Sequence, residues 1–542
     1  MGNATSQAPK LKTPLRPKSS AVAYDKSSLM KIEPNYQNPI IPLLDPLLQG
    51  LGHSARYYLN YYAIRFCQDL VLYDSPQCSA NPFRDLVPMS LEYPFLREII
   101  VAASALHFSN SMRWNKNPQP VVNALVDALG ARHRAIKSLQ DVVERQEALR
   151  NEPANDGERD ALLAAVLFFV NFVLLDSGKG GWRAHMNFVG KLLSLRTTTS
   201  SSLRNSPTSA PELWSDQSPL LDFAAVESLI ALPPAGQHIS SSTSPGIRDY
   251  IASDSVAYYI WSNALDSLVS SLSKTTPPPL TFDGDDDEIL HILIRTEANS
   301  YHSCPSRLLH TVFRTSRLAR DIGASEAGVL TEQQMQSCLE LLREIQTFDG
   351  DAWATEVCTR ITAAVGYMDD VEVQYRKHIA ATFRAAVCLY VLLVAPELPN
   401  QLSQLASSNG IGEDNLPVLP SAEELVATIL HHLSLIPTDS PLFKFATWPI
   451  FLTGVATADS SRRAWLLDRL RDMRYLCPWG MVTSTMETLV EIWQMRDNIA
   501  TTEEHNMGES GLTGESMVSL HERDRNNWLV QLKGFKIDCL IV

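Results

Sequence analysis

The stretch that most constrains this chain is residues 81–114, NPFRDLVPMSLEYPFLREIIVAASALHFSNSMRW, because it shows both the start and the buried face of a helix. Pro94 suits the first helical position, where a missing N–H leaves no hydrogen bond unmade. Apolar residues then recur at the three-and-four spacing of one helical face, at Leu96, Ile99, Ile100, Ala103 and Leu106. Small side chains around Ala103 allow another helix to approach to roughly 8–10 Å between axes. The stretch therefore predicts a helix packed on other helices.

Two further expectations concern the surroundings of this helix. Pro82 and Pro88 predict that the residues before it form a bent, loop-like approach. Arg97 and Ser104 stand seven positions apart and are expected to share a wetter face of the helix.

The same helical periodicity recurs along most of the chain, and no segment shows convincing strand alternation. Helices are expected at residues 56–72, 121–149, 161–175, 182–196, 255–271, 309–322, 331–347, 353–366, 371–394, 445–457, 462–473 and 481–496. Ser421 and Glu424 predict a capping box at the start of one more helix. We predict an all-α fold, an irregular array of about a dozen packed helices with long disordered loops and no constant-period repeat.

Two of these helices have a predicted buried surface. In residues 121–149, one face is expected to point into the core, formed by Val122, Leu125, Val126, Leu129, His133, Ile136 and Leu139. Residues 161–175 are apolar throughout and are expected to form the most buried helix. Fifteen residues span only about 22 Å at the helical rise, which is less than the ~30 Å hydrocarbon core of a bilayer. We therefore expect no membrane-spanning helix.

Composition shifts divide the chain into five parts. Residues 1–40 are basic and polar and predict a disordered tail, and residues 41–196 form the first helical part. Residues 197–254 are rich in Ser, Thr and Pro and predict an insertion. Residues 255–496 form the second helical part, and residues 497–542 form a C-terminal tail.

Charge and cysteine content narrow the class of protein. The formal net charge of −14 argues against nonspecific nucleic-acid binding through the main body, since phosphate contacts need clustered Lys and Arg. Eight cysteines in 542 residues are too sparse for a disulfide scaffold, and no two form a C-x-x-C pair. The first twenty residues have no apolar core segment of a secretory signal. A reducing compartment, the cytosol or the nucleus, is expected.

The segments that resemble catalytic or ligand-binding motifs each lack residues that the motif requires. The segment SGKGG at residues 177–181 lacks the glycine and the hydroxyl residue of a phosphate-binding loop. The acidic pairs Asp285-Asp286 and Asp369-Asp370 lack the further acid that a metal-binding motif would place near them, so solvated turns or helix N-termini are expected. His431 and His432 are adjacent on a helix and point about 100° apart, which favours surface or packing roles. We predict no catalytic, cofactor-binding or metal-binding residue and no enzyme activity.

Six short motifs, in order, carry a resemblance to a known family. They are the NPF-to-SALHFS stretch already described, ARHRAIKSL (131–139), WRAHMNFVGKLLSL (182–195), WPIFLTG (448–454), RAWLLDRL (463–470) and VEIW (490–493). Together they resemble the fungal-specific transcription factor domain, the helical regulatory region found downstream of binuclear zinc-cluster DNA-binding modules. The resemblance covers about residues 41–496.

The resemblance implies transcriptional regulation in the nucleus, but the chain departs from the family at the DNA-reading module. That module needs six cysteines around two zinc ions, and residues 1–66 contain no cysteine. The expected function is therefore control of a pathway-specific gene set, such as a secondary-metabolite biosynthetic cluster. The chain is expected to act by contacts with other transcription factors or coregulators and to reach DNA indirectly through them. A homodimer or a heterodimer is compatible with this function. In a variant of this hypothesis, the sequence is shortened and lacks the zinc module that the whole protein has. A cytosolic effector-binding or scaffolding helical protein is the alternative.

Overall fold

The computed structural model describes residues 48–74, 81–113, 119–148, 156–180, 246–269, 286–302, 304–323, 329–365, 368–408, 419–508, 532 and 539–542. The chain divides into two compact units, residues 1–50 and 51–542, and the following concerns the second unit. The predicted basic tail, the predicted helix at residues 182–196 and nearly all of the predicted insertion lie outside the described residues.

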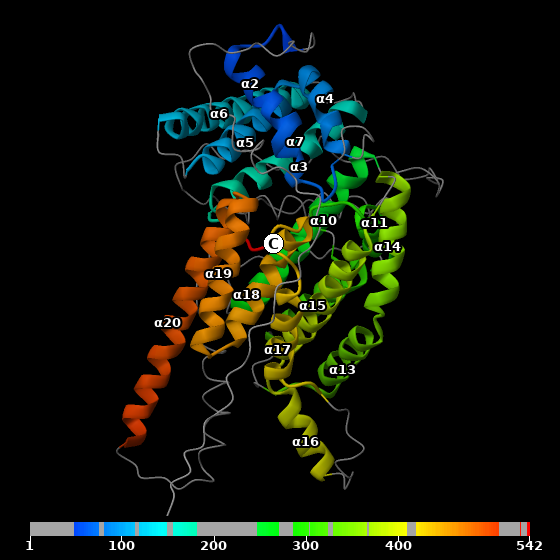
Figure 1. The fold of residues 1–542 in the computed structure, drawn as a ribbon, viewed down its shortest axis with the longest axis vertical. Helices are drawn as coiled ribbons and strands as arrows, with labels where there is room; N and C mark the ends of the chain where they lie inside the picture. Colours follow the sequence, from blue (N-terminus) through cyan, green and yellow to red (C-terminus); the bar gives the residue numbers. More distant parts are fainter. Residues whose placement is uncertain are drawn as a thin grey trace, which may run out of the picture. The chain divides into compact units, whose positions relative to one another are not determined.

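Within the described residues of the second unit, all named elements are helical, which confirms the all-α prediction. The one β contact among them is an isolated bridge between Lys179 and Cys539. The first helices are α2 (His53–Tyr61), the π-helical η2 (Tyr62–Phe66), α3 (Cys67–Asp69), η3 (Pro82–Asp85), α4 (Leu86–Glu92), α5 (Pro94–Ser111), α6 (Gln119–Ala148) and α7 (Asp156–Asp176). They pack on one another around α5, and we call them the N-terminal group (blue to cyan in Figure 1).

The remaining helices form the C-terminal group, packed around α15. They are α10 (Ile247–Val269), α11 (Asp286–Thr296), α12 (Ser306–Gly323), α13 (Glu332–Thr347), α14 (Gly350–Val365), α15 (Asp370–Val394), α16 (Leu398–Ser408), α17 (Ala422–Ser434), η6 (Pro441–Ala446), α18 (Thr447–Ala456), α19 (Ser460–Leu476) and α20 (Gly480–Gly508). The capping box of Ser421 and Glu424 is present at the start of α17, as predicted. Helix α7 contacts both α10 and α20, so the two groups share an interface.

The central helix α5 begins at Pro94 as predicted, and its predicted apolar face is buried. Ser104 was expected on a wetter face, and that expectation is wrong, since the residue is fully buried. The reason is that α5 is covered by α2, α4, α6 and α7, so nearly its whole circumference faces other helices.

The residues before α5 are helical rather than loop-like, which corrects the expectation from Pro82 and Pro88. The Asn81 side chain caps η3 by accepting a hydrogen bond from Phe83 N, and Pro82 stands in the first turn. Pro88 is the third residue of α4. In a first turn the N–H groups have no helical acceptor, so a proline there breaks no bond.

Helix α6 forms as predicted, but much of its predicted core face is exposed. Small residues bury its opposite face against α5: Ala124, Ala128, Ala131 and Ala135. Of the predicted set, Ile136 and Leu139 are buried, whereas five are exposed: Val122, Leu125, Val126, Leu129 and His133. Close packing of the two helices favours the alanines, because they let the axes approach.

The most apolar segments lie inside the packed array. Residues 161–175 of α7 are almost entirely buried, as predicted. Among the described helices, α15 is long and apolar enough to cross a membrane, and 78% of its most apolar window is buried by neighbouring helices, as in a core helix. Trp448 of α18 is buried beside it, with its ring 4.8 Å from that of Trp261 and stacked on Phe383 at 6.5 Å.

Several boundaries differ from those predicted. Helix α10 begins at Ile247 rather than Ser255, α16 is not among the predicted helices, and α20 continues to Gly508. The last four residues, Cys539 to Val542, are buried, and Leu540 N donates to Gly178 O at 2.8 Å. Asp286 is the first residue of α11 and Asp369 caps α15, so these acids stand at helix N-termini as expected.

Candidate functional site

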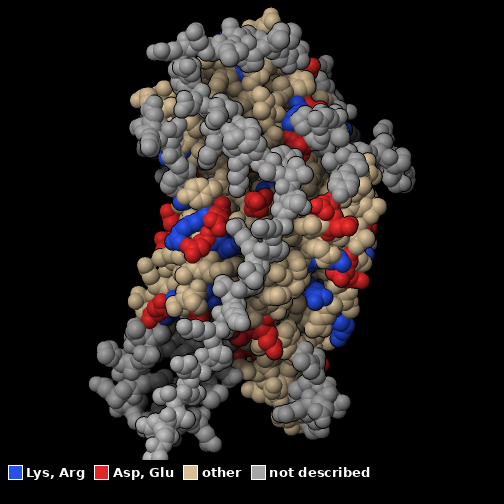
Figure 2. All heavy atoms as spheres, in the orientation of Figure 1, with Lys and Arg blue, Asp and Glu red and all other residues tan. Residues whose placement is uncertain are grey.

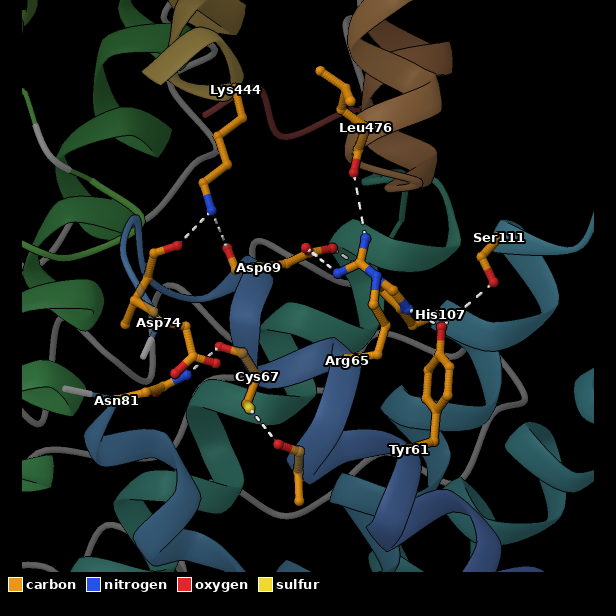
Figure 3. Close-up of polar contacts among 12 residues, drawn as sticks. Tyr61, Arg65, Cys67, Asp69, Asp74, Asn81, His107, Ser111, Lys444 and Leu476 are labelled. Carbon is orange, nitrogen blue, oxygen red and sulfur yellow. Dashed lines mark hydrogen bonds and ion pairs between the residues drawn. The ribbon is translucent and has the colours of Figure 1, made fainter. Parts of the chain in front are cut away.

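A buried ionic cluster lies where the N-terminal group meets the C-terminal group (Figure 3). Its centre is Asp69, the last residue of α3. The carboxylate accepts a hydrogen bond from Arg65 Nη1 at 2.5 Å and another from His107 Nε2 at 2.7 Å. Burial alone would raise the pKa of Asp69, but Arg65 and His107 together hold it below its ordinary value. The group is therefore an anion at neutral pH.

The local helix geometry positions these groups on one face. Tyr61, Arg65 and Asp69 follow one another at intervals of four residues, across the π-helical turn η2 that joins α2 to α3. Side chains four apart on a helix are neighbours. Single π-helical turns occur frequently at functional sites, which makes this segment a candidate by geometry alone.

His107 connects the cluster to the middle of the N-terminal group. It is fully buried on α5, and its ring stacks on Phe66 at 4.9 Å. Burial lowers the pKa of His107, more than Asp69 raises it, so the ring is neutral at pH 7. Its Nδ1 lies 2.8 Å from Tyr61 Oη. The hydroxyl then donates to Nδ1, and Nε2–H donates to Asp69, an assignment made from the partners of each nitrogen.

The C-terminal group supplies the remaining contacts of the cluster. Lys444 of η6 donates through Nζ to the backbone oxygens of Asp69 at 2.9 Å and Val71 at 2.6 Å. Arg65 Nη2 reaches Leu476 O, at the end of α19, at 3.5 Å. Burial lowers the pKa of Lys444, and Asp69 opposes that shift. These contacts connect α3 directly to η6 and α19.

The segment that follows α3 is held from a second side. Asn299 Oδ1 accepts hydrogen bonds from Leu72 N at 3.1 Å and Tyr73 N at 2.8 Å, and Asn299 Nδ2 donates to Tyr73 O at 3.0 Å. Tyr73 also donates to Glu372 of α15, and its ring lies 5.5 Å below the guanidinium of Arg376. Residues 69–73 are therefore held by side chains from η6, α15 and the loop after α11.

The cluster joins its helices through paired polar groups. Each charged group of the cluster is paired with an opposite charge or a carbonyl oxygen, and Asp69 and His107 are buried. Among the described residues, no three or more His, Cys, Asp or Glu side chains are placed to hold a metal ion. Buried paired charges favour one relative placement of the helices that bear them, because separating the pairs would leave uncompensated charge.

The sequence of this helical chain matches a known protein family over most of its length. Residues 57–536 match the family described as fungal specific transcription factor domain. This chain belongs to that family. It is 30% identical over 507 residues to the acriflavine sensitivity control protein acr-2 of Neurospora crassa. The aligned region covers 93% of this chain and 69% of acr-2. No solved structure matches the chain.

The sequence predicted the family but not the ionic cluster. His107 lies in the family motif SALHFS, which was the one sequence signal that pointed to a residue of the cluster. Asp69 and Lys444 lie in segments without a motif. His432 was expected to have a surface or packing role. The structure places its Nδ1 3.0 Å from Nδ1 of His378 on α15, a partner 54 positions away, and leaves His431 exposed.

Charge on the visible surface of this fungal transcription factor domain is mixed. Figure 2 shows Lys and Arg side chains interspersed with Asp and Glu over the described residues of that face. A duplex-binding surface gathers cations along one face, so the described part of the face drawn is not of that kind.

Proposed function

We propose that this fungal transcriptional regulator controls a pathway-specific gene set, such as a secondary-metabolite biosynthetic cluster, from the nucleus. Membership of the transcription factor domain family supports the regulatory role. Because residues 1–66 contain no cysteine and the net charge is −14, we propose that this chain reaches DNA indirectly, through other transcription factors or coregulators.

The buried cluster around Asp69 is the observation that supports the mechanism. It fixes the N-terminal group on η6 and α19, so a partner bound to one group meets the other in a defined position. The helical array then acts as the regulatory platform, and the partner supplies sequence recognition.

The name of the Neurospora crassa relative favours a second candidate gene set. That protein is named for control of acriflavine sensitivity. We propose tolerance of toxic organic compounds as the alternative output of this chain, which a growth assay of the deletion strain on acriflavine would test against a complemented strain.

Chromatin immunoprecipitation of the tagged protein, paired with expression profiling of a deletion strain, tests the proposal. Promoter occupancy, together with loss of a coherent set of transcripts, is expected. Purified chain should not retard the same promoter DNA unless an extract containing its partner is added. No occupancy and unchanged transcripts would overturn the proposal and leave the cytosolic effector-binding or scaffolding protein as the alternative.

A further inference from the structure

Residues 539–542, CLIV, occupy a site between the end of α7 and the start of α20 (red, at the label C in Figure 1). All four residues are buried, with relative exposures between 0% and 5%. Leu540 N donates to Gly178 O at 2.8 Å, and Lys179 forms an isolated antiparallel bridge with Cys539. The segment therefore pairs with the end of α7 in the manner of an added strand.

The end of α7 is shaped to accept a backbone at this place. Gly178 N donates to Val173 O at 2.7 Å, which closes the helix, and the φ of +67° at Gly178 then turns the chain away from the helix axis. A Cβ at position 178 would stand 2.9 Å from Leu540 O and 3.2 Å from Met481 Cβ of α20. Glycine lets the two backbones come this close because it has no side chain. The site is thus built for main-chain contact.

The side chains around the site determine which segment it can hold. Thr488 Oγ1 of α20 is buried 3.3 Å from Cys539 Sγ. At the exposed edge, Lys179 Nζ pairs with Glu487 Oε2 at 2.7 Å, so each charge of the rim has its partner outside the segment. Residues 539–542 carry no charged side chain. Strand addition gains affinity from main-chain hydrogen bonds and specificity from the side chains that are buried. The site therefore fits an uncharged, extended aliphatic segment.

We propose that this is a peptide-binding site, which residues 539–542 fill in this structure and which an extended aliphatic segment of a partner protein fills in exchange. The chemistry of the partner follows from the resident segment, residues 539–542, since a segment of the same kind makes the same contacts. Among the described residues, one backbone hydrogen bond and apolar burial hold the resident segment. The site lies between α7 of the N-terminal group and α20 of the C-terminal group, so the exchange takes place at the interface that the two groups share.

The resident segment acts as an internal competitor. A segment tethered to its own site competes at an effective concentration of up to about millimolar. A free peptide of the same sequence is therefore expected to bind weakly to the wild-type chain and much more tightly once the resident segment is weakened. A segment that is only a fixed part of the core would show no such inverse relation.

Fluorescence anisotropy tests the proposal, with the purified full chain titrated into a labelled peptide that has the sequence of residues 537–542, IDCLIV. Leu540→Glu places a charge in the buried resident segment and should release it. The peptide is then expected to bind this variant at least about tenfold more tightly than wild type. The same peptide with glutamate in place of its leucine should bind neither chain.

A matched pair of glycine substitutions locates the binding. Gly178→Ala, combined with Leu540→Glu, should weaken the peptide at least about tenfold, because a Cβ would stand where the peptide backbone lies. Gly180→Ala, combined in the same way, should retain the affinity. Gly180 has the same positive φ, but nothing lies within 4 Å of a Cβ there.

Circular dichroism and urea unfolding establish that the variants are folded. If Leu540→Glu does not fold, Leu540→Ala is the milder variant, and it should bind the peptide with an affinity between those of wild type and a fully released chain. Two results would overturn the proposal: a folded Leu540 variant that does not bind the peptide, and equal affinities after Gly178→Ala and Gly180→Ala. This test does not depend on the proposed gene set, since it is read on purified protein.

Discussion

His107 Nε2 lies 2.7 Å from Asp69 Oδ2, although the residues are 38 positions apart and the imidazole is fully buried. The contact joins α5, the centre of the N-terminal group, to the end of α3. From the same residue, Asp69, the backbone oxygen accepts a hydrogen bond from Lys444 of the C-terminal group. One aspartate therefore connects the middle of one helical group to the edge of the other.

Asp69→Ala should be strongly destabilising. It removes the anion opposite Arg65 and leaves the Nε2–H of the buried His107 ring without its acceptor. Because the Arg65 side chain is 34% exposed, water partly replaces the lost carboxylate, and the cost should be nearer the about 1.5–3 kcal/mol of a lost hydrogen bond to a charged group. A fall in the urea midpoint would report it. Asp468→Ala removes a carboxylate from an exposed pair with Arg471 and should change the midpoint little. Equal midpoints for the two variants would contradict a central role for Asp69.

The stability of the chain should fall as the pH drops below about 6.5, the ordinary pKa of histidine. Burial lowers the pKa of His302 to about 3 and that of His432 to about 4, and it also lowers the pKa of His107. Between pH 6.5 and 4 the unfolded chain then binds protons that the folded chain does not, so acid favours unfolding. Each such histidine contributes a slope of up to about 1.4 kcal/mol per pH unit.

The pH effect can be assigned to one residue. His302 Nδ1 accepts a hydrogen bond from Trp261 Nε1 at 3.3 Å, which requires the neutral ring. Replacing it by His302→Gln keeps an acceptor for the indole and removes one titrating group. Urea unfolding at pH 7.0, 6.0 and 5.0 should show a shallower loss of stability in the variant. An unchanged slope would show that His302 does not titrate differently in the folded chain.

The helices could be predicted from the sequence because their signals are local. Pro94 and the apolar face of α5 lie within thirteen residues of one another, and both predictions are confirmed. The buried face of α6 was predicted correctly at Ile136 and Leu139 and wrongly at the five other residues. Large aliphatic residues dominate a periodicity pattern, whereas alanines that pack closely contribute little to it. The ionic cluster could not be predicted, because Lys444 and Asp69 are 375 positions apart and no spacing rule relates them.

Gly178→Ala should displace the C-terminal residues, and Gly180→Ala should not. Both glycines have φ near +67°, so each substitution incurs the left-handed backbone penalty of about 1–2 kcal/mol. A Cβ at position 178 would stand 2.9 Å from Leu540 O, whereas nothing lies within 4 Å of one at position 180. Limited carboxypeptidase digestion followed by mass spectrometry should release residues 539–542 faster from Gly178→Ala. Equal release from both variants would show that the close approach to Leu540 does not hold the segment.

Replacing Glu297 by alanine should lower the free energy of unfolding more than replacing it by glutamine. Its buried carboxylate accepts hydrogen bonds from Ser306 N at 2.7 Å, Trp353 Nε1 at 2.6 Å and Arg360 Nη2 at 2.8 Å, and so joins the starts of α12 and α14 to the end of α11. Glu297→Ala leaves three donors without this acceptor and should lower the free energy of unfolding by about 3–5 kcal/mol. Glu297→Gln keeps one carbonyl oxygen and should lose less, with a smaller change in tryptophan fluorescence. If the glutamine variant were as unstable as the alanine variant, the negative charge opposite Arg360, and not the hydrogen bonds, would be the stabilising part.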